Sequence, residues 1–254
     1  MSPTDPLPLS DFPKLHCPFI RQTFKIDPGD WEKEGRPLGL RAPEVYLVVN
    51  RISPGYEWVL DDPETIAVEK LNGSNVKIKT EKGRLVAVQN RLNLIDPLQV
   101  MKGKTFIMEG IFRSLGKGYV KEDGEQAGEL IGPKVQGNPY KLDLHEWYPF
   151  EKAVKDLAYR SFHEHERNFQ NWSDWCREGL ASRYFLKRAS KTGSPDRVMA
   201  EGIVFYNLRR RAEKKTWMAK LRRDMFDWFY ADKIRIYDYV PGGREGVEDQ
   251  DHFD

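Results

Sequence analysis

Lys70 stands where two strand-like segments meet, in the sequence Lys70-Leu-Asn-Gly-Ser-Asn75. A β-branched run ends just before it, and a run that alternates polar and apolar residues begins at Val76. We interpret the segment as a tight strand-to-strand turn that Gly73 permits. A lysine fixed at such a turn can point into a cleft and act as a nucleophile, whereas a solvated turn lysine is the simpler interpretation.

Three further segments place charged residues inside or beside apolar, strand-like runs. They are Gly128-Glu-Leu-Ile131, Glu201-Gly-Ile-Val204 and Lys220-Leu-Arg222. Charged groups at such positions tend to line a site, because burying them without partners is costly. Glu201 and Lys220 fall on two runs joined by a connection of about a dozen residues, so a hairpin would bring both to one cleft wall.

Taken in order, these four segments resemble the motifs of the covalent nucleotidyltransferases, the superfamily of ATP-dependent RNA and DNA ligases and mRNA capping enzymes. Those motifs are KxxG, a GE strand, EGxV and a KxK strand, and here they lie between Glu69 and Arg222. The form KLNGSN looks most like the phage-type RNA ligases. Arg222 replaces the second lysine of KxK, and Asn72 replaces the aspartate common in DNA ligases. The resemblance implies an α+β nucleotidyltransferase fold of twisted, mostly antiparallel sheets flanked by helices.

The resemblance also implies a reaction. Lys70 would attack the α-phosphorus of ATP, release pyrophosphate and hold AMP as a phosphoramidate. The attacking amine must be neutral. Lys220, Arg222 and a Mg²⁺ (or Mn²⁺) ion on the phosphates would each disfavour its charged form and offset the charge of the triphosphate. Glu201 is then the expected metal-holding carboxylate.

Contacts to the nucleotide are implied for a larger set. Glu129 would hydrogen-bond the ribose, Asn75 the ribose or a phosphate, and Arg91 a phosphate. An adenine needs an apolar or aromatic wall; the distance from Glu129 favours Trp147, for which plain core packing is the alternative. The expected nucleotide-binding residues are Glu69, Asn75, Arg91, Glu129, Trp147, Glu201, Lys220 and Arg222.

Two points stay open at the level of sequence. Glu109, in Phe106-Ile-Met-Glu-Gly110, competes with Glu129 for the role on the GE strand. We favour Glu129 because its glycine precedes it, as in the family motif. The glycine- and proline-containing segment from Glu129 to Tyr140 looks like a stretch found in some small RNA ligases, but it assigns no role to Lys134 or Asn138.

The expected substrate is RNA with 5′-phosphate and 3′-hydroxyl ends. Arg209, Arg210 and Arg211 follow one another near the proposed site, where they form either a solvated loop or contacts to RNA phosphates. The short remainder after Lys220 leaves no room for the oligonucleotide-binding barrel typical of DNA ligases and capping enzymes. The alternatives are another lysine-dependent nucleotidyltransferase, of the DNA ligase or capping type, and a non-catalytic RNA-binding protein with this fold.

The composition excludes several classes of protein. With 41 basic and 39 acidic residues the net charge is +2, so a polyanion must be held by a local groove. Two cysteines are too few for a disulfide scaffold. No run approaches the ~18 apolar residues of a membrane span. We expect a cytoplasmic protein with no membrane contact and no obligate protein partner.

The pattern along the chain predicts its organisation. Residues 1–44 are proline-rich and predict an extended arm, residues 45–240 the catalytic domain, and the acidic residues 241–254 a disordered tail. Helices are predicted around Phe106 to Leu115, from Phe150, and after a cap at Ser173. A hairpin is predicted over residues 75–89, a surface loop from Lys187 to Arg197, and paired strands at Gly202 to Tyr206 and Trp217 to Leu221.

Overall fold

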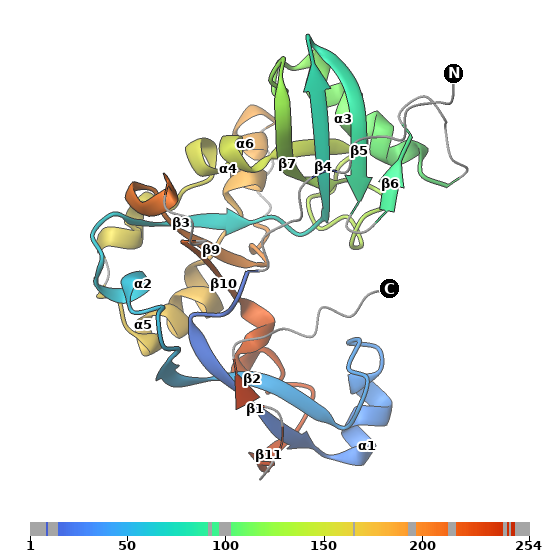
Figure 1. The fold of residues 1–254 in the computed structure, drawn as a ribbon. Coiled ribbons are helices and arrows are strands. Elements are labelled where there is room, and N and C mark those ends of the chain that lie inside the picture. The colour runs from blue at the N-terminus through green and yellow to red at the C-terminus, as the bar shows by residue number, and fades with distance from the viewer. Residues whose placement is uncertain are drawn as a thin grey trace. The chain divides into compact units, whose positions relative to one another are not determined.

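The computed structural model describes residues 9, 15–90, 93–96, 103–164, 166–192, 197–212, 217–240, 243 and 245–246. These residues form helices and antiparallel sheets, which confirms the predicted α+β class (Figure 1). The chain divides into two compact units. Unit 1 comprises Met1–Pro13, Leu71–Ala158 and Ser182–Ala200, and unit 2 comprises Lys14–Lys70, Tyr159–Ala181 and Glu201–Asp254.

Unit 1 is built on a five-stranded sheet of order β6-β5-β4-β7-β8. Its strands are β4 (Ser74–Glu81), β5 (Arg84–Asn90), β6 (Asn93–Ile95), β7 (Gly124–Ile131) and β8 (Glu146–Pro149), and its helices are α3 (Thr105–Gly116), α4 (Phe150–Asp156) and α6 (Arg183–Thr192). Figure 1 shows β4, β5 and β7 side by side, with α3 next to them. Alternate residues of β4, such as Val76 and Ile78, share a buried core with Ile107 and Ile111 of α3. The hairpin and the α3 helix confirm the predictions from sequence.

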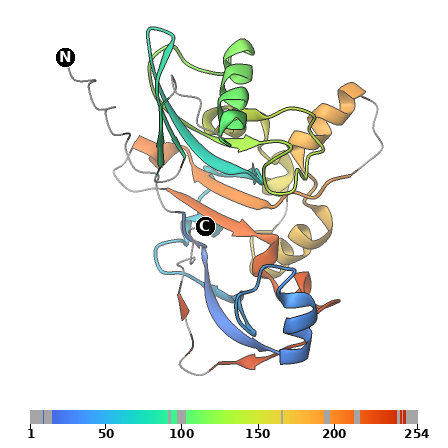
Figure 2. The ribbon, with the colours of Figure 1, turned by 90° about the vertical axis from the view of Figure 1, so that its right-hand side faces the viewer.

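Unit 2 contains two sheets. In the first, β9 (Gly202–Asn207) lies between β10 (Met218–Arg222) and β3 (Thr65–Lys70), and Figure 2 shows β9 and β10 side by side. In the second, β1 (Phe19–Ile26) pairs on one edge with β2 (Glu44–Ile52) and on the other with β11 (Ile236–Tyr239) and β12 (Glu245–Gly246). The short helices are α1 (Pro28–Asp30), α2 (Trp58–Asp61) and α5 (Phe169–Asp174), with one-turn π or 3₁₀ segments at Trp31–Gly35, Arg160–Glu164, Trp175–Gly179, Arg209–Ala212, Arg223–Met225 and Asp227–Phe229.

The prediction of an extended arm over residues 1–44 is wrong for residues 19–35, which form a strand and helical turns. Residues 1–8 and 10–14 lie outside the described residues. Residues 19–26 form β1, whose side chains alternate between buried and less buried positions. Pro18 and Pro28 flank this strand and do not interrupt it. At the other end, Glu245–Gly246 form β12 against Arg21 and Gln22, so the second sheet continues beyond the predicted boundary at residue 240. The rest of the predicted tail lies outside the described residues apart from Gly243.

Two local predictions in the helical region also need correction. Ser173 does not cap a helix: it lies inside α5, which is capped by Asn168 through the backbone N–H of Asn171. Within the segment predicted as a loop from Lys187 to Arg197, residues 187–192 are the second half of α6, and Ser182 caps that helix by accepting the N–H of Phe185. Residues 193–196 lie outside the described residues. Its polar composition marks an exposed helix face, because lysine, arginine and alanine are all good helix formers.

The turn predicted at Lys70 is not a hairpin turn. β3 pairs with β9, whereas β4 pairs with β5 and β7 in the other unit. Lys70 therefore ends one sheet, and the chain enters the next sheet at Ser74. Among the described helices, none is long and apolar enough to cross a membrane.

Candidate active site

Three of the predicted cationic residues share one face of the sheet in unit 2. In the antiparallel register Lys70 lies opposite Gly202, and Gly202 lies opposite Arg222 on its other side. Lys220 lies opposite Val204, one row further along the same face. Side chains two residues apart on a strand point to the same side. The pairing of β3, β9 and β10 thus places Lys70, Lys220 and Arg222 at one end of the same sheet face, although Lys70 is distant from the other two in the sequence.

Glu201 completes this cluster. It immediately precedes β9, and its Oε2 lies 2.7 Å from Nζ of Lys70, with both side chains about one fifth exposed (21% and 22%). Its carbonyl accepts the N–H of Arg223, which fixes the start of β9 against the end of β10. The predicted pairing of the strands that carry Glu201 and Lys220 is confirmed.

The glycines of two motifs are required by close approach to a neighbouring strand. A Cβ on Gly202 would lie 2.3 Å from the carbonyl oxygen of Leu221 and 2.7 Å from Cα of Arg222. A Cβ on Gly73 would lie 2.3 Å from the carbonyl oxygen of Leu130. Gly73 therefore serves packing against β7, and not the tight turn that the sequence suggested. In both places the glycine lets a motif strand approach another strand closely.

Arg222 has a carboxylate neighbour that the sequence did not indicate. Its Nε lies 3.0 Å from Oδ1 of Asp224 in the following 3₁₀ turn, and both side chains are partly exposed. An exposed pair of this kind contributes little to stability, so its main effect is to orient the guanidinium.

Glu69 does not belong to the same face. It lies opposite Ile203, and its row continues to Leu221, both of which are fully buried. Successive residues of a strand point to opposite sides, so the side chain of Glu69 points away from Lys70. With 2% exposure it is a buried carboxylate of the core side. The prediction that it binds nucleotide through its side chain is corrected accordingly.

In unit 1, Asn75 and Glu129 are direct cross-strand neighbours on β4 and β7. They lie on the sheet face opposite to the core face that carries Val76 and Leu130. Oδ1 of Asn75 is buried and has no hydrogen-bond partner among the described residues. An unsatisfied buried acceptor costs about 1–3 kcal/mol, so a hydroxyl or amine donor from a ligand would be bound favourably there.

Lys77 and Gln89 also lie on this face and were missed in the sequence. They lie opposite each other on β4 and β5, and both are largely buried. Lys77 follows Asn75 by two residues, so strand alternation alone would have placed the two side chains on one side. The polar face of the five-stranded sheet therefore carries Asn75, Lys77, Gln89 and Glu129.

Trp147 is a core residue, so its predicted role as an adenine wall is wrong. Its side chain is fully buried in the cluster that includes Val76, Ile111 and Leu130, and its Nε1–H donates to the carbonyl of Val76. In the register of β8 against β7 it is Tyr148, not Trp147, that lies opposite Glu129.

Glu109 has a structural task that explains its presence. It lies on α3, and its carboxylate accepts the backbone N–H of His145 at 3.0 Å and lies 2.8 Å from Nδ1 of the same residue. Burial opposes the charged form, but the bonds from His145 outweigh it and hold the pKa of Glu109 below its ordinary value. Glu129, by contrast, lies on a strand, as the GE-strand motif requires.

The segment after Glu129 supports the residues that follow Lys70. The hydroxyl of Tyr140 accepts the backbone N–H of Asn72 at 2.7 Å, and the side chain of Tyr140 is 1% exposed. Asn138 closes the loop around it: its Oδ1 accepts the N–H of Leu142 and its Nδ2 donates to the Leu142 carbonyl. Asn138 therefore has a structural role, closing this loop, which the sequence did not indicate. The side chain of Lys134 is exposed, and the structure assigns it no role.

The remaining predicted site residues are less favourably placed or not described. Arg91 lies outside the described residues, as does the side chain of Arg211. Arg210 lies 4.5 Å from the ring centroid of Trp217 and 3.6 Å from a carboxylate oxygen of Asp62, so its charge already has partners. Arg209 is exposed.

Glu201 is the carboxylate of this cluster that could hold a metal ion. In the described ranges no three histidine, cysteine or acidic residues are grouped so that they could hold a metal ion, and both cysteines are free and buried. A single accessible carboxylate suits Mg²⁺, which is usually held by one or two carboxylates together with substrate phosphates.

Among known proteins, the chain is similar to solved structures of an RNA ligase. No family model and no curated protein matches the sequence. Among solved structures, it is similar to Naegleria gruberi RNA ligase with PPi (TM-score 0.40, 15% identity) and to two variants of that protein, one with ATP and Mn (0.38, 16%) and one with AMP and Mn (0.40, 15%). Each match covers 66% of this chain, which spans about half, 51%, of the length of those proteins.

Proposed function

We propose that this chain is an ATP-dependent RNA ligase that acts through a lysyl-AMP intermediate. The observation that carries the proposal is the gathering of Lys70, Lys220 and Arg222 on one sheet face, with Glu201 in contact with Lys70. Three sequence motifs that are far apart in the chain supply these four residues. A nucleophile, a carboxylate for a divalent cation and two cations for phosphates are the groups that nucleotidyl transfer needs.

The first step uses the neutral amine of Lys70. Its nitrogen lone pair forms a bond to the α-phosphorus of ATP, and the bond from that phosphorus to the bridging oxygen breaks as pyrophosphate leaves with the electron pair. The nitrogen then releases one proton to solvent, which leaves a phosphoramidate with a neutral nitrogen. Lys220 and Arg222 stabilise the negative charge on the phosphates as the bond breaks. In the subsequent steps the 5′-phosphate of RNA receives AMP, and a 3′-hydroxyl displaces it to seal the strand.

Glu201 has two successive tasks in this proposal. Before ATP binds, it holds Lys70 in place through the 2.7 Å ion pair. The carboxylate of Glu201 would hold a Mg²⁺ or Mn²⁺ ion that accompanies ATP, and Lys70 would then lose the partner that favours its protonated form. A bound divalent cation would neutralise the phosphates and favour pyrophosphate as a leaving group.

In unit 1, the unsatisfied Oδ1 of Asn75 and the adjacent carboxylate of Glu129 support a role in binding a ribose hydroxyl. Arg209 is exposed, and we propose it as a contact to the RNA backbone.

The proposal is tested by incubating the protein with ATP and Mg²⁺ and measuring its intact mass. A gain of one AMP, with release of pyrophosphate, is the expected result. Adding RNA with 5′-phosphate and 3′-hydroxyl ends should then discharge the adduct and yield sealed RNA. No adduct would reject nucleotidyl transfer. An adduct that RNA does not discharge, or that a nicked all-DNA duplex discharges as fast, would reject RNA as the substrate.

Replacing Glu129 by alanine is expected to raise the ATP concentration needed for half-maximal adenylation by roughly 10- to 100-fold. The loss of a charge-assisted hydrogen bond of about 1.5–3 kcal/mol to the ribose is the reason. Glu109→Ala is the matched control: it should lower the melting temperature, because His145 loses both partners, and leave the ATP requirement unchanged. The opposite pattern in the two variants would exchange their roles.

Tyr140→Phe is expected to slow adenylation by about two- to tenfold, because the N–H of Asn72, two residues after Lys70, loses a hydrogen bond of about 0.5–1.5 kcal/mol. Tyr140 is a positioning residue, so the maximal rate should fall while the ATP concentration for half-maximal rate stays constant. Tyr159→Phe removes a comparable buried hydrogen bond, to the carbonyl of Ala181, and serves as control. An equal loss of rate in the control would indicate a general loss of stability.

A further inference from the structure

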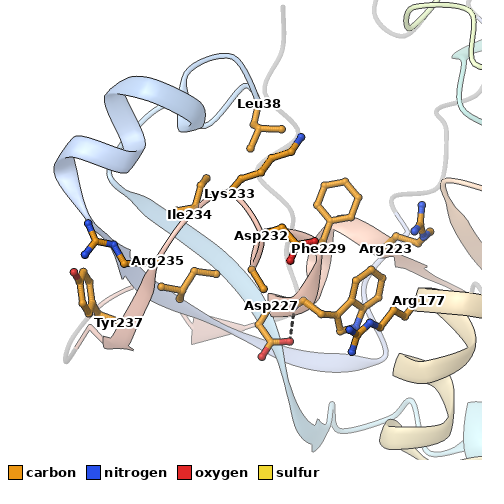
Figure 3. Close-up of a pocket in the computed structure, with 13 residues that line it drawn as sticks. Leu38, Arg177, Arg223, Asp227, Phe229, Asp232, Lys233, Ile234, Arg235 and Tyr237 are labelled. Atoms are coloured by element: carbon orange, nitrogen blue, oxygen red, sulfur yellow. Dashed lines mark hydrogen bonds between the residues drawn. The ribbon is translucent and has the colours of Figure 1, made fainter.

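A pocket of about 880 Å³ lies in unit 2 beyond the end of β10. Its lining includes Arg177, Arg223, Trp228, Phe229 and Lys233 (Figure 3). Pockets of roughly 300–1,000 Å³ hold small molecules or parts of larger ones. None of these residues belongs to the motif set described above, although Arg223 directly follows Arg222 and donates its backbone N–H to the carbonyl of Glu201.

The aromatic wall of the pocket is rigid. The ring of Trp228 stacks on Phe226 at 5.3 Å with an interplanar angle of 15°, and its Nε1–H donates to the hydroxyl of Ser173. Phe229 packs edge-on against Tyr230 and is 39% exposed, so part of its ring faces solvent. A fixed and partly exposed aromatic ring is the kind of surface on which a nucleobase stacks.

Cations surround this wall. The guanidinium carbon of Arg223 lies 5.7 Å from the ring centroid of Trp228 and 5.9 Å from that of Phe229, and its Nε donates to the carbonyl of Cys176. Within the described part of the chain no ion pair is recorded for Arg177, Arg223 or Lys233.

The opposite end of the pocket is neutralised. Figure 3 shows Arg235 and Tyr237 at the end away from Arg177 and Arg223. Arg235 is held by Asp30 at 3.0 Å and by Asp27 at 3.5 Å. Asp227 and Asp232 also line the pocket, and they do not belong to this end: Asp227 accepts the backbone N–H of Trp228 in the aromatic wall, and Figure 3 shows Asp232 beside Phe229. The cations available to an anion therefore lie beside the aromatic wall.

We infer that this pocket binds single-stranded RNA, with a base stacked on Phe229 and the flanking phosphates near Arg177, Arg223 and Lys233. The choice of RNA over another anionic chain rests on the proposed function, whereas the combination of stacking surface and unpaired cations is independent of it. Arg223, which lines the pocket, directly follows Arg222 in the sequence. An RNA strand bound there is therefore held in the same unit as Lys70.

Binding of a fluorescein-labelled single-stranded RNA 12-mer to the full chain, followed by anisotropy, tests the inference. Phe229→Ala should weaken binding at least about fivefold, because stacking contributes about 1–3 kcal/mol per base. Lys233→Ala should lower the slope of log affinity against log salt by about 0.7, the value for one phosphate contact on a single strand. The controls are Phe112→Ala, an exposed aromatic of α3, and Lys155→Ala, an exposed lysine of α4, and neither should change binding.

Two further measurements, adenylation of the variants and competition by other anions, distinguish a failure of this inference from a failure of the proposed function. Adenylation of Lys70 by ATP should be equal in the wild type and in both pocket variants; its absence from all of them would defeat the proposed function, and not this inference. If wild type and variants are adenylated but bind RNA equally well, the inference is wrong. It is also wrong if AMP alone binds with the same dependence on Phe229, or if polyglutamate displaces the RNA as effectively as unlabelled RNA does, because the pocket would then accept a mononucleotide or any polyanion.

Discussion

Lys70→Ala is expected to abolish formation of the AMP adduct. The side chain lies at the end of β3, in contact with Glu201 and on the same face as Lys220 and Arg222. No other group can replace its nitrogen in the phosphoramidate, so the effect should be complete and not partial. Peptide mapping after exposure to ATP and Mg²⁺ should place the adduct on Lys70, and the adduct should be lost in acid and stable in alkali, as a phosphorus–nitrogen bond is.

Lys25→Ala provides the control, since Lys25 is an exposed lysine of β1 in the same unit. It should be adenylated like the wild type. Lys70→Arg should also fail, because the guanidinium keeps its positive charge and does not act as a nucleophile. An adduct on Lys220, or an undiminished adduct in Lys70→Ala, would show that the nucleophile has been misassigned.

Glu201→Gln is expected to reduce the rate of adenylation by at least about a hundredfold at low Mg²⁺. The substitution removes the negative charge that binds the metal, an interaction that contributes several kcal/mol to stabilising the charge developed during the reaction. The amide has nearly the size of the carboxylate. The substitution therefore removes the negative charge that attracts Lys70 and leaves the packing around it unchanged. Raising Mg²⁺ or Mn²⁺ should recover part of the rate if weakened metal binding is the cause.

Glu64→Gln is a suitable comparison because Glu64 is an exposed acid of unit 2 outside the cluster. It should show the same metal dependence as the wild type. If Glu201→Gln is adenylated at the normal rate, then Glu201 only holds the end of the strand. If its rate is low but independent of metal concentration, its role lies in positioning Lys70 alone.

The cluster in unit 2 could be predicted from the sequence because its members lie on strands with strong local patterns. The apolar runs around Ile203 and Leu221 predicted two strands, and the short connection between them predicted their pairing, which is confirmed. Successive residues of a strand point to opposite faces, so the sequence could also have shown that the side chain of Glu69 points away from that of Lys70. Trp147 was misassigned for a related reason, since its distance from Glu129 along the chain does not indicate which face of β8 it occupies.

Other features depend on contacts between distant segments and have no local signature. The bond from Asn72 to Tyr140 spans 68 residues and requires the loop that Asn138 closes. The role of Glu109 likewise depends on His145, 36 residues later. The strand at residues 19–26 was missed because the prolines on either side of it dominated the composition of the segment, and because two of its buried positions hold the polar residues Arg21 and Thr23.

Synthesis from the N-terminus determines when the chain can react with ATP. Lys70 and Glu201 are 131 residues apart, and the neighbour of β3 in its sheet is β9. During translation Lys70 leaves the ribosome well before Glu201, its ion-pair partner. It also emerges before β9, which follows Glu201, and β10, which carries Lys220. Pairing of segments so far apart is slow to form, and such a domain completes its fold late in translation. A nascent chain should therefore be unable to take up AMP until residues 201–222 have emerged.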